Sequence, residues 1–392
     1  MSNGAAPPPG ALDRAMVALV AEPDHRATDL VTALAQAPAD LAGHVVEHGL
    51  AGLAHLHAKH LRPLYPMLVD ALAAARQDAW SRHLTTLVDL AVVSTALEPL
   101  TGQWAVVKGP ALAERTYGRG DLRRYHDVDL LVHPAHFGSA LDLLEAAGVT
   151  LLDRNWELIR SSMRAELSLQ VNGRTTVDLH WHLLNEAAIR RRARWDMPQL
   201  LARAGPKRLG PLTVPVLDDV DALVHLAVHA CLSGGHRLIW LKDLERQQSS
   251  FPVDMQEVEG RARGARLWPA VHLALLRSST TFDRPAPPHP PAWSRLHRRL
   301  GTDGFRTAGG VGGDGRTLAM GTREGVVSSV AAVADTVAHH SLFPPLRRTP
   351  LRAVVPPVHA QLADLRRGGG TAQDRAEYLR AVATTVVGRP PP

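Results

Sequence analysis

The first hundred residues have apolar positions spaced for helices. Between residues 11 and 100 the apolar side chains recur three and four positions apart, without the alternation of a strand. Met67–Leu97 predicts one or two amphipathic helices that end before Pro99, and Thr28-Asp29-Leu30-Val31 opens another. We therefore expect a helical N-terminal region over 11–100, preceded by a disordered Gly- and Pro-rich stretch over 1–10.

The pattern changes at Gln103, where short apolar runs begin to alternate with helical ones. Strands are predicted over Trp104–Val107, Tyr125–His133 and Val149–Asp153. Helices are predicted between them, over Ala111–Thr116 and Pro134–Ala147. The segment 101–185 is thus expected to form a compact core that mixes strands and helices.

A β-hairpin is the clearest local signal in the chain. Two alternating runs, Ala165–Val171 and Arg174–Trp181, flank Asn172-Gly173, a dipeptide that favours a type I′ turn. In the second run Thr176, Asp178 and His180 share one face, while the intervening apolar residues share the other.

The chain then returns mainly to helical patterns. Helices are predicted over Asp218–Ala230, Leu238–Arg246 and Leu267–Arg277, within a helical region over 186–280. A Pro- and Gly-rich linker over 281–325, a helical C-terminal region over 326–387 and a disordered tail over 388–392 follow. The order of elements favours an α+β fold with helical regions on both sides of the core in sequence.

Composition sets broad limits on function. The 392 residues exceed one ordinary core, so two domains or one elaborated domain are expected. The net charge of +6 suits phosphate-bearing ligands or nucleic acid, but a solvated basic surface has the same balance. The single cysteine, Cys231, excludes an internal disulfide, and no apolar run is long enough to span a bilayer. With no signal-peptide pattern at the start, we expect a cytoplasmic protein that does not contact a membrane.

Two aspartates one residue apart carry the strongest chemical signal. Asp127 and Asp129 lie within an apolar run, so a strand places both on one face with Cα atoms roughly 6.6 Å apart. Close carboxylates repel unless a cation neutralises them, and Mg²⁺ bound to nucleotide phosphates is a common solution. Asp178, on a separate strand, would complete such a clamp and accept a proton from an attacking hydroxyl. The alternative is that Asp127 and Asp129 form the polar face of a half-exposed strand.

Lys108-Gly109 is a candidate phosphate-binding turn. A glycine between a strand and a helix lets backbone N–H groups approach phosphate oxygens, and Lys108 adds a positive charge. A simple strand-to-helix turn is the alternative, and Pro110 removes one N–H donor from the turn.

These motifs together resemble a known family. Four segments carry the resemblance, in the order VVKGPALAERTYGRGDLRRYHDVDLLV, LDLLEAAGV, VDLHWHL and HLAVHACLSGGHRLIWLKDL. Between about Thr85 and Glu245 the chain is similar to the nucleotidyltransferase-like family with the polymerase β-type fold. It is most similar to a bacterial branch in which Lys-Gly replaces the usual Gly-Ser of the phosphate loop. The resemblance implies a small mixed sheet with helices on one side and a helical C-terminal part that covers the nucleotide. It also implies Mg²⁺-dependent transfer of a nucleoside monophosphate from an NTP, such as ATP, to an acceptor.

The resemblance also assigns roles to residues. Asp127 and Asp129 match the metal-binding pair, Asp178 the third carboxylate, and Lys108-Gly109 the phosphate loop. Arg123 is placed to meet a triphosphate, and Tyr117 lies where this branch often has an aromatic residue. No Ser hydroxyl follows Gly109, a departure that affects phosphate handling.

Histidines and arginines leave further possibilities open. His225 and His229 are four residues apart and would stack on one helix face, a spacing that can hold zinc, but the Glu of a zinc-protease motif is missing. Contact of His229 or His236 with a nucleotide is suggested by the family pattern. The basic run from Arg190 to Arg194 favours a solvated helix face over RNA binding, because aromatic residues for base stacking are scarce nearby.

The acceptor is not indicated by the sequence, and two other functions stay open. One is a non-catalytic nucleotide- or RNA-binding module that keeps the fold. The other is a tailoring or regulatory protein of a biosynthetic or toxin–antitoxin operon, with a peptide or protein acceptor.

Overall fold

The computed structural model describes residues 10–22, 29–191, 193–233, 237–289 and 363–385. Most of the predicted linker over 281–325, much of the predicted C-terminal region and nearly all of both predicted disordered ends lie outside these ranges. Among the described residues, no helix combines the length and apolarity needed to cross a membrane.

A mixed sheet forms the centre of the described structure. Its strands are β1 (Trp104–Val106), β2 (Asp127–Val132), β3 (Thr150–Leu151), β4 (Glu166–Val171), β5 (Thr175–His180), β6 (Gly205–Leu209) and β7 (Leu212–Val216). Their spatial order is β3-β4-β5-β2-β1-β7-β6. β2 runs parallel to β5 and β1 parallel to β7, while every other neighbouring pair is antiparallel. The predicted α+β class with a mixed sheet is confirmed.

The sheet extends further along the chain than the sequence pattern indicated. Strands β1 to β5 lie where short strands were expected, but β6 and β7 fall in a segment that was read as mainly helical. Both contain a proline, Pro206 and Pro215, which pair with each other across the hairpin. Prolines lower the strand signal because they cannot donate to the ladder, and β6 tolerates Pro206 as the edge strand of the sheet.

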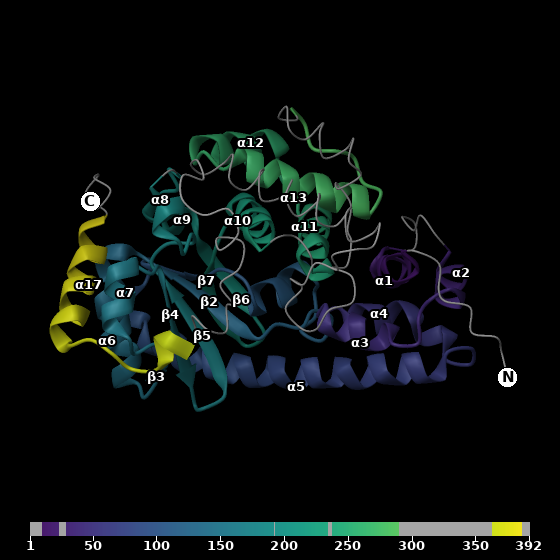
Figure 1. The fold of residues 1–392 in the computed structure, drawn as a ribbon, viewed down its shortest axis with the longest axis horizontal. Helices are drawn as coiled ribbons and strands as arrows, with labels where there is room; N and C mark the ends of the chain where they lie inside the picture. Colours follow the sequence, from purple (N-terminus) through teal and green to yellow (C-terminus); the bar gives the residue numbers. More distant parts are fainter. Residues whose placement is uncertain (1–9, 23–28, 192, 234–236, 290–362, 386–392) are drawn as a thin grey trace, which may run out of the picture.

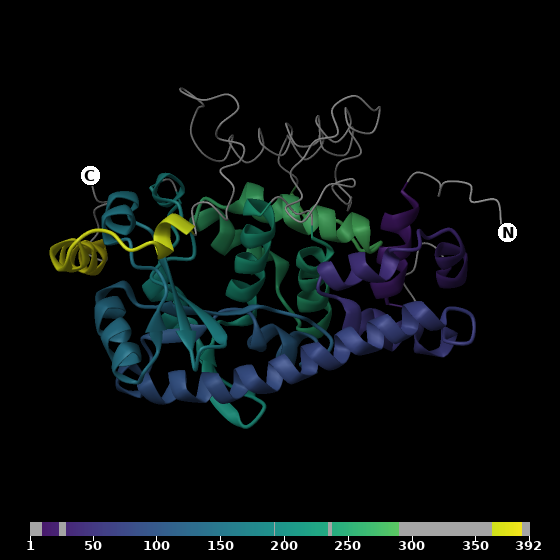
Figure 2. The ribbon, with the colours of Figure 1, turned by 60° about the horizontal axis from the view of Figure 1, so that its bottom comes forward.

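One face of the sheet packs on the long helix α5 and on three shorter helices. These are α5 (Pro66–Ala96), α6 (Phe137–Ala146), α7 (Trp156–Ser162) and α17 (Ala372–Thr384). The even-numbered residues of β2, from Val128 to Val132, point to this side and are buried with Leu87 and Leu90 of α5. Figure 2 shows α5 running beneath the sheet.

The opposite face is covered by a second set of helices. They are α8 (Ala187–Arg190), α9 (Met197–Arg203), α10 (Asp219–Leu232), α12 (Met255–Gly264) and α13 (Trp268–Thr281). Ala105, Val107 and Leu131 of the sheet contribute to this second core. Helices therefore lie on both faces of the sheet. The helices of the core segment, α6 and α7, lie on the α5 face, as the expectation of helices on one side implies. The opposite face is covered by helices from the region that follows the core (Figure 2).

The N-terminal helices form a third packed unit beside the sheet. They are α1 (Ala11–Val20), α2 (Leu30–Ala35), α3 (Leu41–Glu47) and α4 (Ala51–Ala58), packed with the first half of α5 and with α11 (Leu238–Ser250). At about 1.5 Å per residue, the 31-residue α5 is long enough to join this unit to the sheet (Figure 1). The remaining short turns are η2 (Lys59–Leu61), η3 (Glu98–Leu100), η4 (Leu112–Thr116) and η5 (Pro134–His136).

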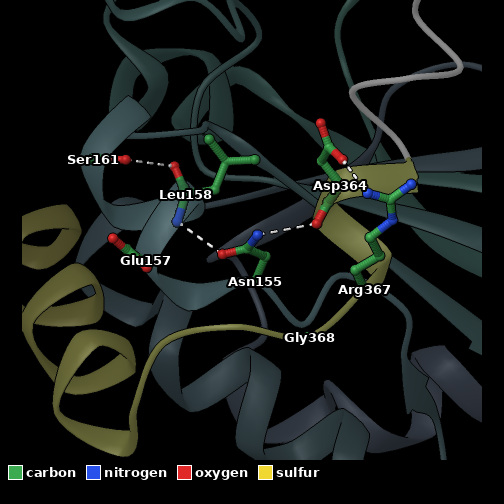
Figure 3. A pocket seen from close by; sticks show the side chains of 7 residues that line it. All are labelled: Asn155, Glu157, Leu158, Ser161, Asp364, Arg367 and Gly368. Carbon is green, nitrogen blue, oxygen red and sulfur yellow. Dashed lines mark hydrogen bonds and ion pairs between the residues drawn. The ribbon is translucent and has the colours of Figure 1, made fainter.

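The C-terminal segment docks beside α7 and leaves a shallow hollow there. Asn155 caps α7 through Leu158 N, and its amide donates to the carbonyl of Asp364 (Figure 3). A single parallel bridge joins Asn155 to Gly369, and α17 packs along α7. The hollow, about 420 Å³, is thus bordered by polar groups that already bond to the docked segment. We interpret it as the seam of that docking rather than as a reaction site.

Candidate active site

Three aspartates converge on the sheet face beneath α10. Asp127 and Asp129 point to this face from β2, and Asp178 points to it from β5. The parallel register of β2 and β5 sets Asp129 directly beside Asp178. This register brings Asp129 and Asp178, which are 49 positions apart in sequence, side by side. The structure thus groups the carboxylates that the sequence singled out.

The hairpin between β4 and β5 adds two polar side chains to the same face. Asn172 and Gly173 both have positive φ, as a type I′ turn requires. The loop nevertheless has three residues, because Arg174 follows them and the first paired residues are Val171 and Thr175. This register places Ser168 opposite Asp178 and Glu166 opposite His180. The Ser168 hydroxyl donates to Asp178 Oδ1 over 2.8 Å.

A pocket of about 330 Å³ opens over these side chains, and its walls come from distant parts of the chain. Its floor is acidic, and α10 closes it from above. The lining residues are Lys108, Asp127, Asp129, Glu166, Asp178, His180, Leu183, Asn185, Glu186, Ile189, His225, His229 and Leu232. The volume is at the lower end of the range for small-molecule sites.

Lys108 is the positive charge nearest the aspartates. Its ammonium lies 3.1 Å from Asp129 Oδ1, and His180 Nε2 lies at the same distance from that oxygen. Burial alone would raise the pKa of Asp129, but Lys108 and the His180 hydrogen bond outweigh it and hold that pKa well below its usual value. Burial would lower the pKa of Lys108, but the aspartates raise it to about 12. Lys108 is therefore charged when the pocket holds no ligand.

Asp178 has the opposite environment. Burial, together with the charges of Glu166, Asp129 and Asp127, raises the pKa of Asp178 to about 7. Burial and Asp129 also raise the pKa of Asp127. The floor thus carries more negative charge than Lys108 alone neutralises.

The donor set fits a hard divalent cation such as Mg²⁺. Asp129 Oδ2 is buried and has no hydrogen-bond partner among the described residues, so one carboxylate oxygen on the floor is left for a ligand. Carboxylate oxygens are the protein ligands that Mg²⁺ prefers, and a cation would relieve the repulsion that raises the pKa of Asp178. In the ranges that the structure describes, no three acidic or histidine side chains are already spaced as a closed metal cage.

Comparison with known families identifies the chain. A family described as "Uncharacterised nucleotidyltransferase" matches residues 36–283, which is more than half of the chain and includes every residue that lines the pocket. The chain belongs to this nucleotidyltransferase family. Searches among curated proteins and among solved structures found no match.

The residues that the family matches include the candidate phosphate loop, Lys108-Gly109. In the structure the backbone at Gly109 closely approaches the backbone at the start of β2. Gly109 has φ of +65°, and a Cβ there would lie 2.7 Å from the carbonyl oxygen of Asp127. Only glycine fits, because any side chain would push the start of β2 away. Gly109 does not line the pocket, and its missing side chain allows the turn after Lys108 to approach the start of β2.

Arg123 does not line the pocket. Its Nε and Nη2 each donate to the carboxylate of Asp243 over 2.7 Å, and the Tyr117 hydroxyl donates to the same carboxylate over 2.9 Å. All three side chains are buried, at the contact between the segment before β2 and α11. The guanidinium that was expected to meet a triphosphate instead joins two parts of the fold.

The histidines divide into two cases. His229 lines the pocket, as does His225, whereas His236 lies outside the described residues. The rings of His225 and His229 lie 6.1 Å apart, and among the described residues no group of three metal-binding side chains includes them.

The basic run is partly used inside the structure. Arg190 lies over the ring of Trp181 at 4.5 Å and donates to the carbonyl of Leu184. A stacked and hydrogen-bonded arginine of this kind orders the loop beside the pocket and does not present a free face to RNA.

Glu166 and Ser168 were missed by the sequence reasoning. The signal was present, because Glu166, Ser168 and Gln170 form the polar phase of an alternating strand. The sequence did not indicate that Arg174 is an extra loop residue. This residue shifts the hairpin register by one position and so determines which alternating side chains of β4 share a face with Asp178.

Proposed function

We propose that the pocket transfers a nucleoside monophosphate from an NTP to a hydroxyl-type acceptor, with Mg²⁺ as cofactor. The observation that carries the proposal is the register of β2 and β5, which sets Asp129 beside Asp178 on a face that also holds Asp127 and Lys108. In-line phosphoryl chemistry depends on positioning and charge stabilisation, and this group of residues supplies both kinds of contact. Membership of a nucleotidyltransferase family supports the same reaction class.

Each side chain has a distinct role in the proposal. Asp127, Asp129 and Asp178 would hold Mg²⁺, which supplies charge stabilisation to the phosphates when bound. The Lys108 ammonium, which lies beside Asp129 Oδ1, would turn away from it and donate to a phosphate oxygen of the NTP.

Asp178 would accept the proton of the acceptor hydroxyl. Ser168 holds Asp178 Oδ1, so the carboxylate has a fixed orientation relative to the floor. His229 at the pocket wall would contact the bound nucleotide, as the family pattern suggests. We retain Gly109 in the proposal as the residue that positions Lys108.

The test begins with the wild-type chain, Mg²⁺ and each labelled NTP in turn. Pyrophosphate release is measured, and mass spectrometry of the protein and of added hydroxyl compounds detects an added nucleotide. Self-modification is examined first because it requires no knowledge of the acceptor. Asp129→Ala should lower transfer by about 10³-fold or more while circular dichroism stays unchanged.

Asp78→Asn is the matched control, because Asp78 pairs with Arg82 on the surface of α5. It should transfer nucleotides as the wild type does. Undiminished labelling by Asp129→Ala would refute the proposal. Nucleotide binding without pyrophosphate release, across all NTPs and acceptors, would favour a non-catalytic binding module.

A further inference from the structure

A row of aromatic rings runs along α10, and two of its members line the pocket. The rings of Trp195, His225, His229 and Trp240 follow one another with centroid separations of 6.1, 6.1 and 5.6 Å. His225 and His229 line the pocket directly. The pocket therefore has two unlike sides, a charged floor and a wall that carries two imidazole rings.

His225 is the member of this row whose bonding is incomplete. Only 5% of its surface is exposed, and both Nδ1 and Nε2 are buried without a hydrogen-bond partner in the part of the chain that the structure describes. Buried polar side chains in folded proteins are nearly always paired, and those left unpaired call for an explanation such as a missing ligand. Because His225 lines the pocket, a ligand in the pocket can supply the missing partner.

The chemistry of the imidazole restricts the kind of ligand. Burial, and then the nearby charge of Lys108, lowers the pKa of His225 to about 3, so the ring is neutral at physiological pH. A neutral imidazole has one N–H donor and one bare nitrogen acceptor. Ionised phosphate oxygens only accept hydrogen bonds, and Lys108 already offers them a charge. A nucleobase has both donors and acceptors on its edge, and its flat face suits an aromatic wall.

Apolar side chains support the same division of the pocket. Leu183, Ile189 and Leu232 line it together with the two histidines. Such a wall offers no partner for a triphosphate but packs well against a planar ring.

We propose that His225 contacts the nucleobase of the NTP and thereby determines which NTP the pocket accepts. This inference rests on the proposed function, since it assigns the base to the wall of the same site whose floor handles the phosphates. His225 is thus a specificity-determining residue that was not among the nucleotide contacts expected from the sequence.

The variant His225→Phe tests this, because it keeps a ring of similar size and removes both nitrogens. For the preferred NTP we expect KM to rise about 10- to 100-fold and the preference over the other NTPs to shrink, with kcat changed less than about threefold. Inhibition by inorganic tripolyphosphate, which has no base, should stay as in the wild type. Lys108→Ala should show the reverse, with weaker tripolyphosphate inhibition and an unaltered order of preference among NTPs.

His272→Phe serves as the matched control. His272 is also fully buried and packs on an aromatic ring, that of Trp268, but it lies on α13 and does not line the pocket. It should leave KM and NTP preference unchanged. Dissociation constants from calorimetry, measured for each NTP without acceptor, provide a readout that does not depend on turnover.

The outcomes separate the two proposals. A wild-type chain that neither binds nor uses any NTP would overturn the proposed function. A wild-type chain that uses NTPs, together with a folded His225→Phe variant of unchanged KM and preference, would overturn only the role of His225. If His225→Phe does not fold, His225→Gln replaces it. Glutamine keeps one donor and one acceptor in another geometry, so we expect an altered NTP preference, and an unaltered one would overturn the role equally.

Discussion

Buried carboxylates on the two faces of the sheet differ in how completely their oxygens are paired. On the α5 face, Asp89 accepts hydrogen bonds from the side chains of Asn172, Arg174 and Thr175 at the β4–β5 hairpin. Although burial opposes ionisation, these hydrogen bonds lower the pKa of Asp89. On the α10 face, no described residue pairs with Asp129 Oδ2, and the pKa of Asp178 is raised to about 7.

This difference distinguishes carboxylates that hold the fold together from carboxylates that remain available to a ligand. A buried charge with all its oxygens paired stabilises the fold, because removing it leaves the partners unpaired. Buried carboxylates that repel one another, with an oxygen left unpaired, destabilise the fold, and such clusters are concentrated at functional sites. The Arg123–Asp243 pair belongs with Asp89 by this criterion, since both oxygens of Asp243 are paired.

The largest expected effect on stability comes from Asp89→Ala. The variant removes the acceptor of three side chains at the hairpin, of which Thr175 is buried, so we expect the free energy of unfolding to fall by about 3–4 kcal/mol. Urea denaturation of the wild type and variant measures the change. The exposed Asp78→Asn should change stability by less than about 0.5 kcal/mol. A loss below about 1 kcal/mol for Asp89→Ala would show that Asp89 does not hold the hairpin on α5.

The central aspartates could be predicted because their signal is local. Asp127 and Asp129 share a face through the period of a strand, and Asp178 lies in an arm of a hairpin marked by Asn172-Gly173. Strands β1 to β5 and the long helix over Met67–Leu97 were readable for the same reason. Each of these features depends on residues within about ten positions of one another.

The features that the sequence did not reveal depend on distant contacts or on single residues. Asp243 is 120 positions from Arg123, so nothing near Arg123 shows that its guanidinium is already paired. The extra loop residue Arg174 shifts the register of the hairpin and brings Glu166 to the pocket. Prolines concealed β6 and β7, although an edge position makes Pro206 acceptable.

Arg123→Lys tests whether Arg123 belongs with the structural carboxylates or with the site. Lysine keeps the charge but cannot make the bidentate contact with Asp243, so we expect a loss of about 2 kcal/mol in urea denaturation. KM for the NTP should stay within about twofold, because Arg123 does not line the pocket. Tyr117→Phe, which removes one hydrogen bond to the same carboxylate, should cost about 1 kcal/mol. A tenfold rise in KM with unchanged stability would restore the expectation that Arg123 meets the triphosphate.

An effect of opposite sign is expected for Asp178→Asn in the absence of divalent cations. The pKa of Asp178 is about 7 in the folded chain and roughly 3.9 when unfolded, so the folded state binds this proton more tightly. The stabilisation from the bound proton is complete below about pH 4 and is lost as pH rises through about 7.

Asparagine stays neutral and keeps an oxygen for the Ser168 hydroxyl. Because water in the open pocket screens the repulsion, we expect the variant to exceed the wild type by about 1–2 kcal/mol at pH 8 in EDTA. The gain should vanish near pH 4 and shrink when Mg²⁺ is added to the wild type. Urea denaturation at both pH values measures it, and a variant less stable than the wild type at pH 8 would place Asp178 with Asp89 among the carboxylates that hold the fold.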